Sequence, residues 1–249
     1  MTLFSFEVPI AHLEDFSEYQ DFHFALSMLC RTSKKYLEFY QSKVEQTLKV
    51  VWLDNSFNEK MKADDPFLLV RTAQKLRPHL IFGPDSPKWP ITRIQEAFEA
   101  TRNLLKNVLP QTSIAVVVKD QAMKAHLENR GARNFAVSHW IPERVQSNHD
   151  AVQWARSCHF LGMNSPQELW ELQPPSCDTT LPIKLAMQGK TLRGWWEEGC
   201  PYTHDSNPVE QRRRKKEYFN LHFDDKTLEL AINNIKALKE VCNAYDPKR

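Results

Sequence analysis

Three aspartates stand where predicted strands end, and their side chains are the first candidates for chemistry. Asp54 follows the apolar run 50–53, Asp85 follows the run 79–82, and Asp178 ends a short run near 175–178. In an alternating strand–helix chain, catalytic side chains are found at the carboxyl ends of the strands. Carboxylates gathered there repel, so one can act as nucleophile or base while another accepts a hydrogen bond or carries a proton. Each aspartate could instead be a turn or helix-cap residue, because aspartate is common in both roles.

The histidines and cysteines add one further candidate and no metal site. His139 follows the predicted strand 134–138, which makes it the best placed histidine for a site. Cys200 and His204 lie close together, but a zinc site needs three or four ligands at set spacing. The five cysteines show no Cys-x-x-Cys pair, which favours a reducing compartment over a disulfide framework. We expect no metal and no cofactor.

Eight apolar stretches can supply the strands that position these side chains, and most of them precede a helical pattern. They lie near 3–8, 22–28, 50–54, 79–83, 114–118, 134–138, 158–161 and 175–178. Continuous apolar runs are typical of parallel strands covered on both faces, and eight strand–helix units suit a (β/α)8 barrel. The alternative is a doubly wound open sheet, which usually carries a glycine-rich phosphate loop that this chain lacks. We predict an α/β fold, a (β/α)8 barrel over 1–190, with a basic loop and a C-terminal helix over 191–249 packing on it within the same domain.

Composition and charge narrow the functional classes. The chain is 41% hydrophobic and 26% charged, as is usual for a soluble globular protein, and its net charge of +2 does not demand a nucleic-acid partner. The amino terminus lacks the features of a signal peptide, and no apolar run approaches the roughly 20 residues of a membrane helix. We therefore expect a cytoplasmic protein without membrane contact.

One segment is strongly basic. Residues 212–216 read Arg-Arg-Arg-Lys-Lys, and Trp195, Trp196 and Tyr218 lie nearby in the sequence. Positive charges beside aromatic rings suit a nucleic-acid backbone with stacked bases. The same run could also be a solvated face without a partner.

Three motifs resemble the tRNA-guanine transglycosylase superfamily. Residues 178–189 have the spacing of the family's nucleophile motif, and residues 159–169 are similar to the strand and turn that precede it. Residues 53–59, Leu-Asp-Asn-Ser-Phe-Asn-Glu, are closer to a smaller branch, the 7-deazaguanine DNA transglycosylases, which are often encoded by phages. The resemblance covers residues 1–190.

The resemblance implies a reaction and a role for several residues. A carboxylate attacks C1′ of a guanosine and expels guanine, and a 7-deazaguanine such as preQ0 then displaces the enzyme. By this match Asp178 is the nucleophile, Asp54 is the acid or base, and Asp85 binds the nucleobase. Lys119 replaces a glutamine of the family, which leaves the identity of the base open. The expected substrate-binding residues are Asp85, Asn55, Glu59, Lys119, Ser138, His139, Leu161 and Gly162, and the expected nucleic-acid-binding residues are Lys184, Arg212, Arg213, Arg214, Lys215 and Lys216.

The resemblance also favours one class of partner. The zinc site of the tRNA enzymes is absent after residue 190, so we expect exchange of guanine in DNA rather than in tRNA, on a flipped or single-stranded base. An enzyme acting on tRNA or on free nucleosides is an alternative, and so is a non-catalytic nucleobase-binding subunit. Whether the protein forms a homodimer or uses a partner protein is left open.

Overall fold

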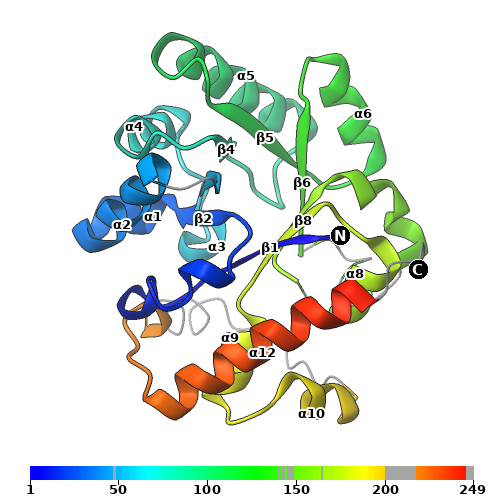
Figure 1. The fold of residues 1–249 in the computed structure, drawn as a ribbon. Coiled ribbons are helices and arrows are strands. Elements are labelled where there is room, and N and C mark those ends of the chain that lie inside the picture. The colour runs from blue at the N-terminus through cyan, green and yellow to red at the C-terminus, as the bar shows by residue number, and fades with distance from the viewer. Residues whose placement is uncertain are drawn as a thin grey trace. The chain divides into compact units, whose positions relative to one another are not determined.

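The computed structural model describes residues 1–46, 49–139, 141, 144, 149–163, 165–199 and 217–244. Eight parallel strands with helices between them form a (β/α)8 barrel (Figure 1), and the order of the strands in the sheet is β1-β8-β7-β6-β5-β4-β3-β2. The strands are β1 (Leu3–Phe6), β2 (His23–Leu26), β3 (Val51–Asp54), β4 (Leu80–Phe82), β5 (Ser113–Val118), β6 (Asn134–Ser138), β7 (His159–Leu161) and β8 (Ser176–Thr179). The predicted fold class is confirmed.

Helices follow most of these strands. The described α-helices are α1 (Ser27–Thr32), α2 (Lys34–Gln46), α3 (Phe57–Lys60), α4 (Pro66–Leu76), α5 (Ile91–Val108), α6 (Gln121–Asn129), α8 (Pro166–Leu172), α9 (Leu181–Met187), α10 (Leu192–Glu197) and α12 (Asp225–Ala244). Three short 3-10 segments, η1 (Ile10–His12), η2 (Ser17–Tyr19) and η3 (His149–Ser157), lie in the connections. No described helix has both the length and the apolar character that a membrane crossing requires.

All eight strands appear where the apolar runs predict them. The run 22–28 is the exception in extent, because β2 ends at Leu26 and Ser27 already begins α1. The Ser27 hydroxyl donates a hydrogen bond to Asp64 Oδ2 at 2.8 Å. As the first residue of α1, Ser27 thus has a buried hydrogen-bond partner in Asp64. The run of apolar residues in the sequence does not reveal this partner.

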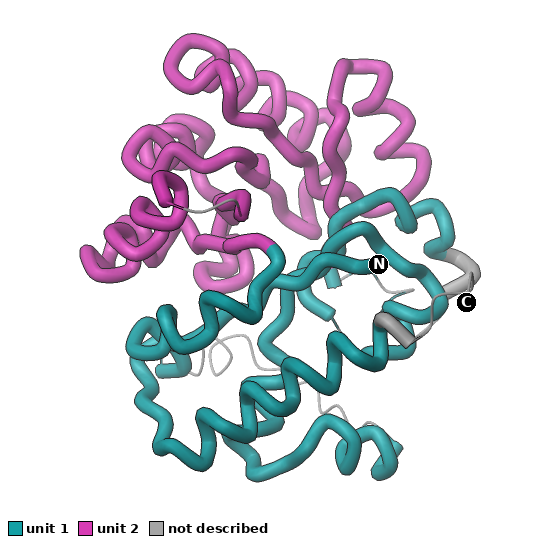
Figure 2. The backbone as a smooth tube through the Cα atoms, viewed as in Figure 1, with its two compact units in different colours: residues 1–21, 139–249 teal, residues 22–138 magenta. Residues whose placement is uncertain are grey.

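The chain divides into two compact units (Figure 2), residues 1–21 with 139–249 (unit 1) and residues 22–138 (unit 2). Unit 1 holds β1, β7 and β8, and unit 2 holds β2 to β6. Residues 191–249, for which we predict a loop and a closing helix, belong to unit 1.

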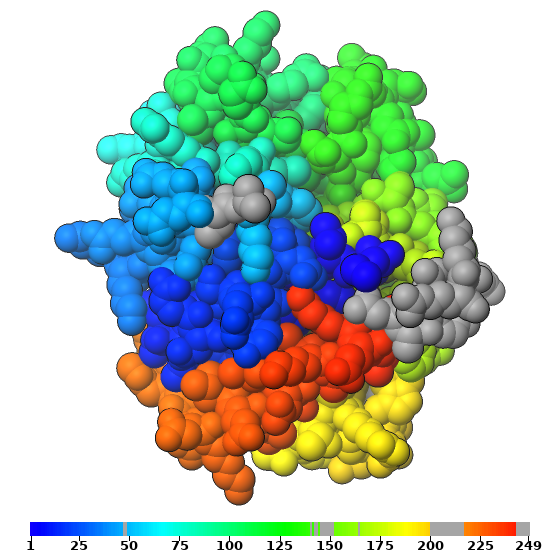
Figure 3. Space-filling view, in the orientation of Figure 1, coloured from blue at the N-terminus to red at the C-terminus, as the bar shows by residue number. Residues whose placement is uncertain are grey.

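Helix α12 is tied to the rest of unit 1 by polar contacts. Asn234 is buried, accepts a hydrogen bond from the Leu192 N–H at 2.7 Å, and donates to the carbonyls of Pro182 (3.1 Å) and Lys190 (3.0 Å). The helix also lies against the N-terminal segment (Figures 1 and 3), where Lys239 Nζ is 2.7 Å from Asp21 Oδ1. These contacts hold the C-terminal helix against α9, against the start of α10 and against the N-terminal segment.

Aromatic rings from three strands form part of the core of unit 2. Phe24 of β2 lies 5.4 Å from Phe82 of β4 between ring centroids, and Trp52 of β3 lies 6.0 Å from the same ring. Phe22, at the start of β2, packs 4.2 Å from Trp52. Large aromatic rings contribute much of the apolar area of a core. The packing of these rings therefore holds β2, β3 and β4 together and helps to position the residues at their carboxyl ends.

Candidate active site

Asp178 is held in one orientation at the end of β8, within unit 1. Its side chain is buried, and Oδ1 lies 3.1 Å from His159 Nε2. The backbone N–H of Gly162 donates to both carboxylate oxygens, at 3.2 Å to Oδ1 and 3.3 Å to Oδ2. Donors on a carboxylate restrict its rotation, so the Asp178 oxygens are held in one orientation.

A second histidine contact extends this arrangement into the strand. His159 of β7 pairs in register with Ser176 of β8, and its Nδ1 lies 2.9 Å from Ser176 Oγ. Ser176 and Asp178 are two residues apart, so their side chains project from the same face of the strand. In the tautomer with the proton on Nε2, His159 donates to Asp178, and its Nδ1 accepts a hydrogen bond from the Ser176 hydroxyl.

Gly162 supplies the backbone donor, and its surroundings explain why this residue is a glycine. Its φ is +66°, and a Cβ added there would lie 2.9 Å from Nδ1 of His139. From the other side, Arg144 Nη2 donates to the Gly162 carbonyl at 2.7 Å, while the buried Arg144 pairs with the buried Glu168 at 3.0 Å. The turn after β7 is therefore fixed on both sides, and it places the Gly162 N–H beside Asp178.

In unit 2, Asn55 connects two strand ends. Its Nδ2 donates to the Gly83 carbonyl at 2.7 Å and to Asp85 Oδ1 at 2.8 Å, while its Oδ1 accepts the Phe57 N–H at 2.8 Å. Asn55 and Asp85 are both buried. The turn after β3 and the loop after β4 are thereby locked together, and one edge of the Asp85 carboxyl is defined.

Asp54 is the last residue of β3 and is buried. Its Oδ2 accepts the Ser56 N–H at 2.6 Å, and Ser56 has a left-handed backbone with φ +56°. A non-glycine residue in this conformation costs of order 1–3 kcal/mol, and such strain concentrates at functional sites. The Ser56 hydroxyl accepts the Met28 N–H at 3.0 Å, which holds the strained turn in place.

Burial and charge set the protonation of Asp85 and Lys119. Burial raises the pKa of Asp85 to about 6, although the hydrogen bond from Asn55 and the charge of Lys119 both oppose the shift. Desolvation lowers the pKa of Lys119, whose Nζ donates to the Trp89 carbonyl at 2.5 Å. Near neutral pH the Asp85 carboxyl can therefore accept a proton or release one, as a nucleobase-binding or acid–base residue requires.

The structure places the predicted site residues in two groups, each within its own unit. Asp178, Gly162, Leu161 and His139 gather at the ends of β8 and β7 in unit 1, where the His139 N–H donates to the Leu161 carbonyl at 3.0 Å. In unit 2, Asp54, Asn55, Asp85 and Lys119 follow β3, β4 and β5, Glu59 is buried in α3, and Ser138 ends β6.

The other predictions have different outcomes. Lys184 is exposed on α9. Residues 212–216, Cys200 and His204 lie outside the described residues, and within the described ranges no three potential ligands gather as a metal site. Asp178 does not have the helix-cap contacts that were its alternative: Thr180 is the N-cap residue of α9, and the Leu181 N–H bonds to Thr179 Oγ1 at 3.0 Å.

Sequence reasoning missed His159 and Ser176, neither of which is among the predicted site residues. The alternation of Ser176 and Asp178 on one strand face was the only available signal. Cys177 between them is not a nucleophile candidate, because burial raises the pKa of its thiol well above the ordinary value.

Comparisons with known proteins show the fold and no family. No family model matches the chain, and no curated protein matches it. Among solved structures, a candidate phosphonomutase from Burkholderia cenocepacia J2315 has a TM-score of 0.51 at 12% identity, over 80% of this chain and 93% of that chain.

Two other matches are weaker. A 2,3-dimethylmalate lyase of the PEP mutase/isocitrate lyase superfamily gives a TM-score of 0.49 at 9% identity, over 98% of this chain and 93% of that one. An N-acetylneuraminate lyase from Fusobacterium nucleatum gives 0.46 at 8% identity, over 95% and 98%. The likeness to the candidate phosphonomutase, at 12% identity, shows the barrel fold alone.

The comparisons overturn the resemblance to the tRNA-guanine transglycosylase superfamily and its 7-deazaguanine branch. The candidate phosphonomutase, at a TM-score of 0.51, is not a transglycosylase, and no family model matches the chain by sequence. The family prediction was wrong. Motifs of about ten residues at strand ends follow from strand–turn–helix geometry as well as from descent, so they did not establish a family.

Proposed function

We propose that this protein is an enzyme that transfers a pentosyl group, with Asp178 as the nucleophile. The carboxylate attacks C1′ of a nucleoside unit, the C1′–N bond breaks, and its electron pair leaves with the base, which takes a proton from an acid. An incoming base then attacks C1′, loses a proton, and releases Asp178. The observation that carries the proposal is the clamped Asp178 carboxylate, with the Gly162 N–H on both oxygens and His159 on Oδ1.

The contacts of Asp178 suit this step for a physical reason. A nucleophile contributes most when it is held in its reactive orientation before the substrate arrives. One donor belongs to a fixed backbone turn, and the other belongs to a ring anchored at its far nitrogen by Ser176. Both donors can stay in place while one carboxylate lone pair bonds to carbon.

The groups of unit 2 are assigned separately. The Asp85 carboxyl, with a pKa of about 6 and one edge fixed by Asn55, suits hydrogen bonding to the donor edge of a purine. Asp54, buried at the end of β3, is proposed as an acid or base of unit 2.

The Ser176–His159–Asp178 chain favours a second candidate, a hydrolase with a serine nucleophile. Its hydrogen-bond order is that of a serine–histidine–aspartate triad. However, Ser176 is the first residue of β8, at the amino end of the strand, and it is buried. Asp178 is nearer the carboxyl end, where (β/α)8 enzymes bind substrate, so we prefer Asp178 as the reacting group.

Base exchange with labelled guanine tests the proposal. The protein is incubated with labelled base and with DNA, tRNA or free nucleosides, and incorporation of label is measured for the wild type, Asp178→Asn and Ser176→Ala. We expect Asp178→Asn to lose exchange by at least about 10³-fold, because the nucleophile is gone, and Ser176→Ala to retain most of it. Absence of exchange, together with hydrolysis of an ester substrate that is lost in Ser176→Ala, would favour the serine hydrolase.

The finer proposal concerns the partner and the incoming base. We propose DNA as the nucleic acid and a 7-deazaguanine as the incoming base, and both can be read from the same assay by mass spectrometry of the nucleosides. If label were incorporated only into tRNA or only into free nucleosides, that molecule and not DNA would be the substrate. The proposed role of Asp178 would be unaffected.

A further inference from the structure

A cavity of about 690 Å³ opens in unit 2 beside the first turns of α4 and α5. Its lining includes Lys62, Asp65, Leu68, Trp89 and Arg93. Sites for small molecules and cofactors typically measure about 300–1,000 Å³, so the cavity can hold a nucleotide.

The positive charges of this cavity are of two kinds. Arg31 and Lys60 both pair with Asp64, a buried carboxylate, so ion pairs hold these two cations in place. Lys62 and Arg93 are exposed, and neither forms an ion pair with any of the residues that the structure describes.

The carboxylates of the lining do not cancel this charge. Asp65 serves as the cap of α4, accepting the Phe67 N–H at 2.9 Å, and Glu96 is exposed on α5. With Asp64, these three acids face the four cations of the lining, which leaves a net charge of +1 on the whole lining. Lys62 and Arg93, which are exposed and are not held in an ion pair by another described residue, can meet an anion.

An aromatic ring stands beside one of these cations. The Arg93 guanidinium lies 4.4 Å from the centroid of the Trp89 ring. The Trp89 carbonyl accepts a hydrogen bond from Lys119 Nζ at 2.5 Å, which anchors the end of the loop that begins at Gly83 and carries Asp85. A stacking ring beside a guanidinium is the combination by which proteins bind a base together with its phosphate.

We infer that this cavity binds a phosphate-bearing nucleotide, with Arg93 and Lys62 on the phosphate and Trp89 stacked on the base. The inference rests on the proposed function, because that function makes a nucleoside unit the substrate, and it adds that the substrate carries phosphate. The loop 83–90 carries both Trp89, which lines the cavity, and Asp85, which Asn55 holds.

Equilibrium binding tests this inference without any chemistry. A fluorescent single-stranded DNA oligonucleotide is titrated with protein while its anisotropy is followed, and a mononucleotide and the matching nucleoside serve as competitors. We expect the mononucleotide to compete better than the nucleoside, and the double variant Lys62→Gln/Arg93→Gln to bind DNA at least about tenfold more weakly, with a salt slope shallower by about one to two units.

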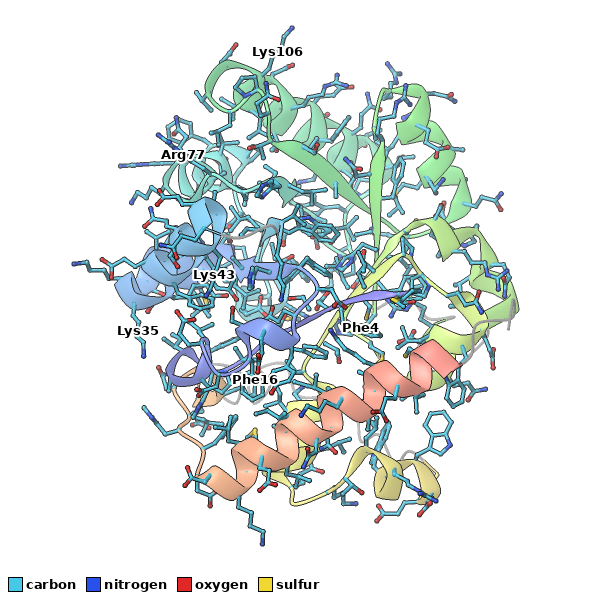
Figure 4. The ribbon with its side chains drawn as sticks, viewed as in Figure 1. Phe4, Phe16, Lys35, Lys43, Arg77 and Lys106 are labelled. Atoms are coloured by element: carbon cyan, nitrogen blue, oxygen red, sulfur yellow. The ribbon has the colours of Figure 1, made fainter. Side chains whose placement is uncertain are left out.

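Matched variants separate this site from general charge. Lys106→Gln removes one exposed positive charge at the far end of α5, where the side chain points away from the protein (Figure 4), and should bind like the wild type. Trp89→Phe should retain most of the binding, whereas Trp89→Leu should lose several-fold. Circular dichroism verifies that each variant is folded.

Two results would overturn the inference: wild-type affinity in the Lys62→Gln/Arg93→Gln protein, or an equal loss in Lys106→Gln. Competition by mononucleotide and oligonucleotide distinguishes a free nucleotide from a nucleic acid as the source of the phosphate. The binding assay requires no turnover, so a failure of the proposed chemistry leaves its result unaffected.

Discussion

Asp85 is a buried carboxyl whose pKa is raised to about 6 from 3.8. A carboxyl with a higher pKa in the folded state stabilises the protein at low pH, and that stability is lost as the pH rises through the folded-state value. Near neutral pH the ionised group therefore destabilises the fold. Retaining such a group is expected where it has a chemical role.

Replacing Asp85 by asparagine should stabilise the protein at neutral pH. We expect Asp85→Asn to unfold with a free energy up to about 3 kcal/mol higher at about pH 7.5, and to match the wild type near about pH 4, where both side chains are uncharged. Urea denaturation at both pH values measures this, with the exposed Glu38→Gln as a control. Equal stability at both pH values would show that burial of Asp85 has no net cost.

His23 should show the opposite dependence on pH. It is buried beside Phe39 and Tyr40, and neither ring nitrogen has a hydrogen-bond partner among the residues that the structure describes. Burial lowers its pKa to about 4 from 6.5. Because the unfolded chain binds the proton first, stability is lost as the pH falls from 6.5 towards 4, by up to about 3 kcal/mol.

The variant His23→Leu removes that titration. We expect its stability relative to the wild type to rise as the pH falls through this window, and little change near neutral pH, since no hydrogen bond is lost. The difference between the two proteins in urea denaturation, measured at several pH values, isolates His23 from other groups. A constant difference would contradict the account.

At the scale of elements, the turn after β7 is the feature that prepares Asp178. Gly162 must be left-handed, must donate its N–H, and must leave room for His139. Gly189, after α9, has nearly the same φ of +68° but has nothing within 4 Å of an added Cβ. A comparison of alanine substitutions at the two glycines therefore distinguishes the effect of backbone strain from the effect of crowding against His139.

We expect Gly162→Ala and Gly189→Ala each to lose about 1–2 kcal/mol of stability from the left-handed conformation alone. Only Gly162→Ala should also lose base exchange, by tenfold or more, because the new methyl group pushes against His139 and shifts the N–H donor. Thermal unfolding and the exchange assay, run on both variants, test this. An equal loss of exchange in both would mean that Gly162 acts only through stability.

At the scale of the whole molecule, the fold could be predicted from the sequence more completely than the contacts of the candidate site. Continuous apolar runs such as Ile114–Val118 are visible without a structure, so the eight strands and the barrel could be predicted, and Asp54 and Asp178 at strand ends followed. The pairing of His159 with Ser176 could not be predicted from the sequence, because it depends on the register between β7 and β8. The left-handed Ser56 was likewise hidden, since serine carries no signal for that conformation.

The family prediction failed for a related reason. It depended on short motifs around residues 53–59 and 159–189, which lie where any (β/α)8 enzyme places a strand end and a turn. The chemistry proposed for Asp178 now depends on contacts in the structure instead of those motifs.

A covalent adduct at Asp178 is the most direct test of the central claim. The protein is mixed with nucleic acid, quenched with acid during turnover, and digested, and the peptides are analysed by mass spectrometry. We predict a pentosyl ester on the peptide that contains Asp178, absent in Asp178→Asn. Exchange activity with the adduct on any residue other than Asp178, such as Ser176, would contradict the account.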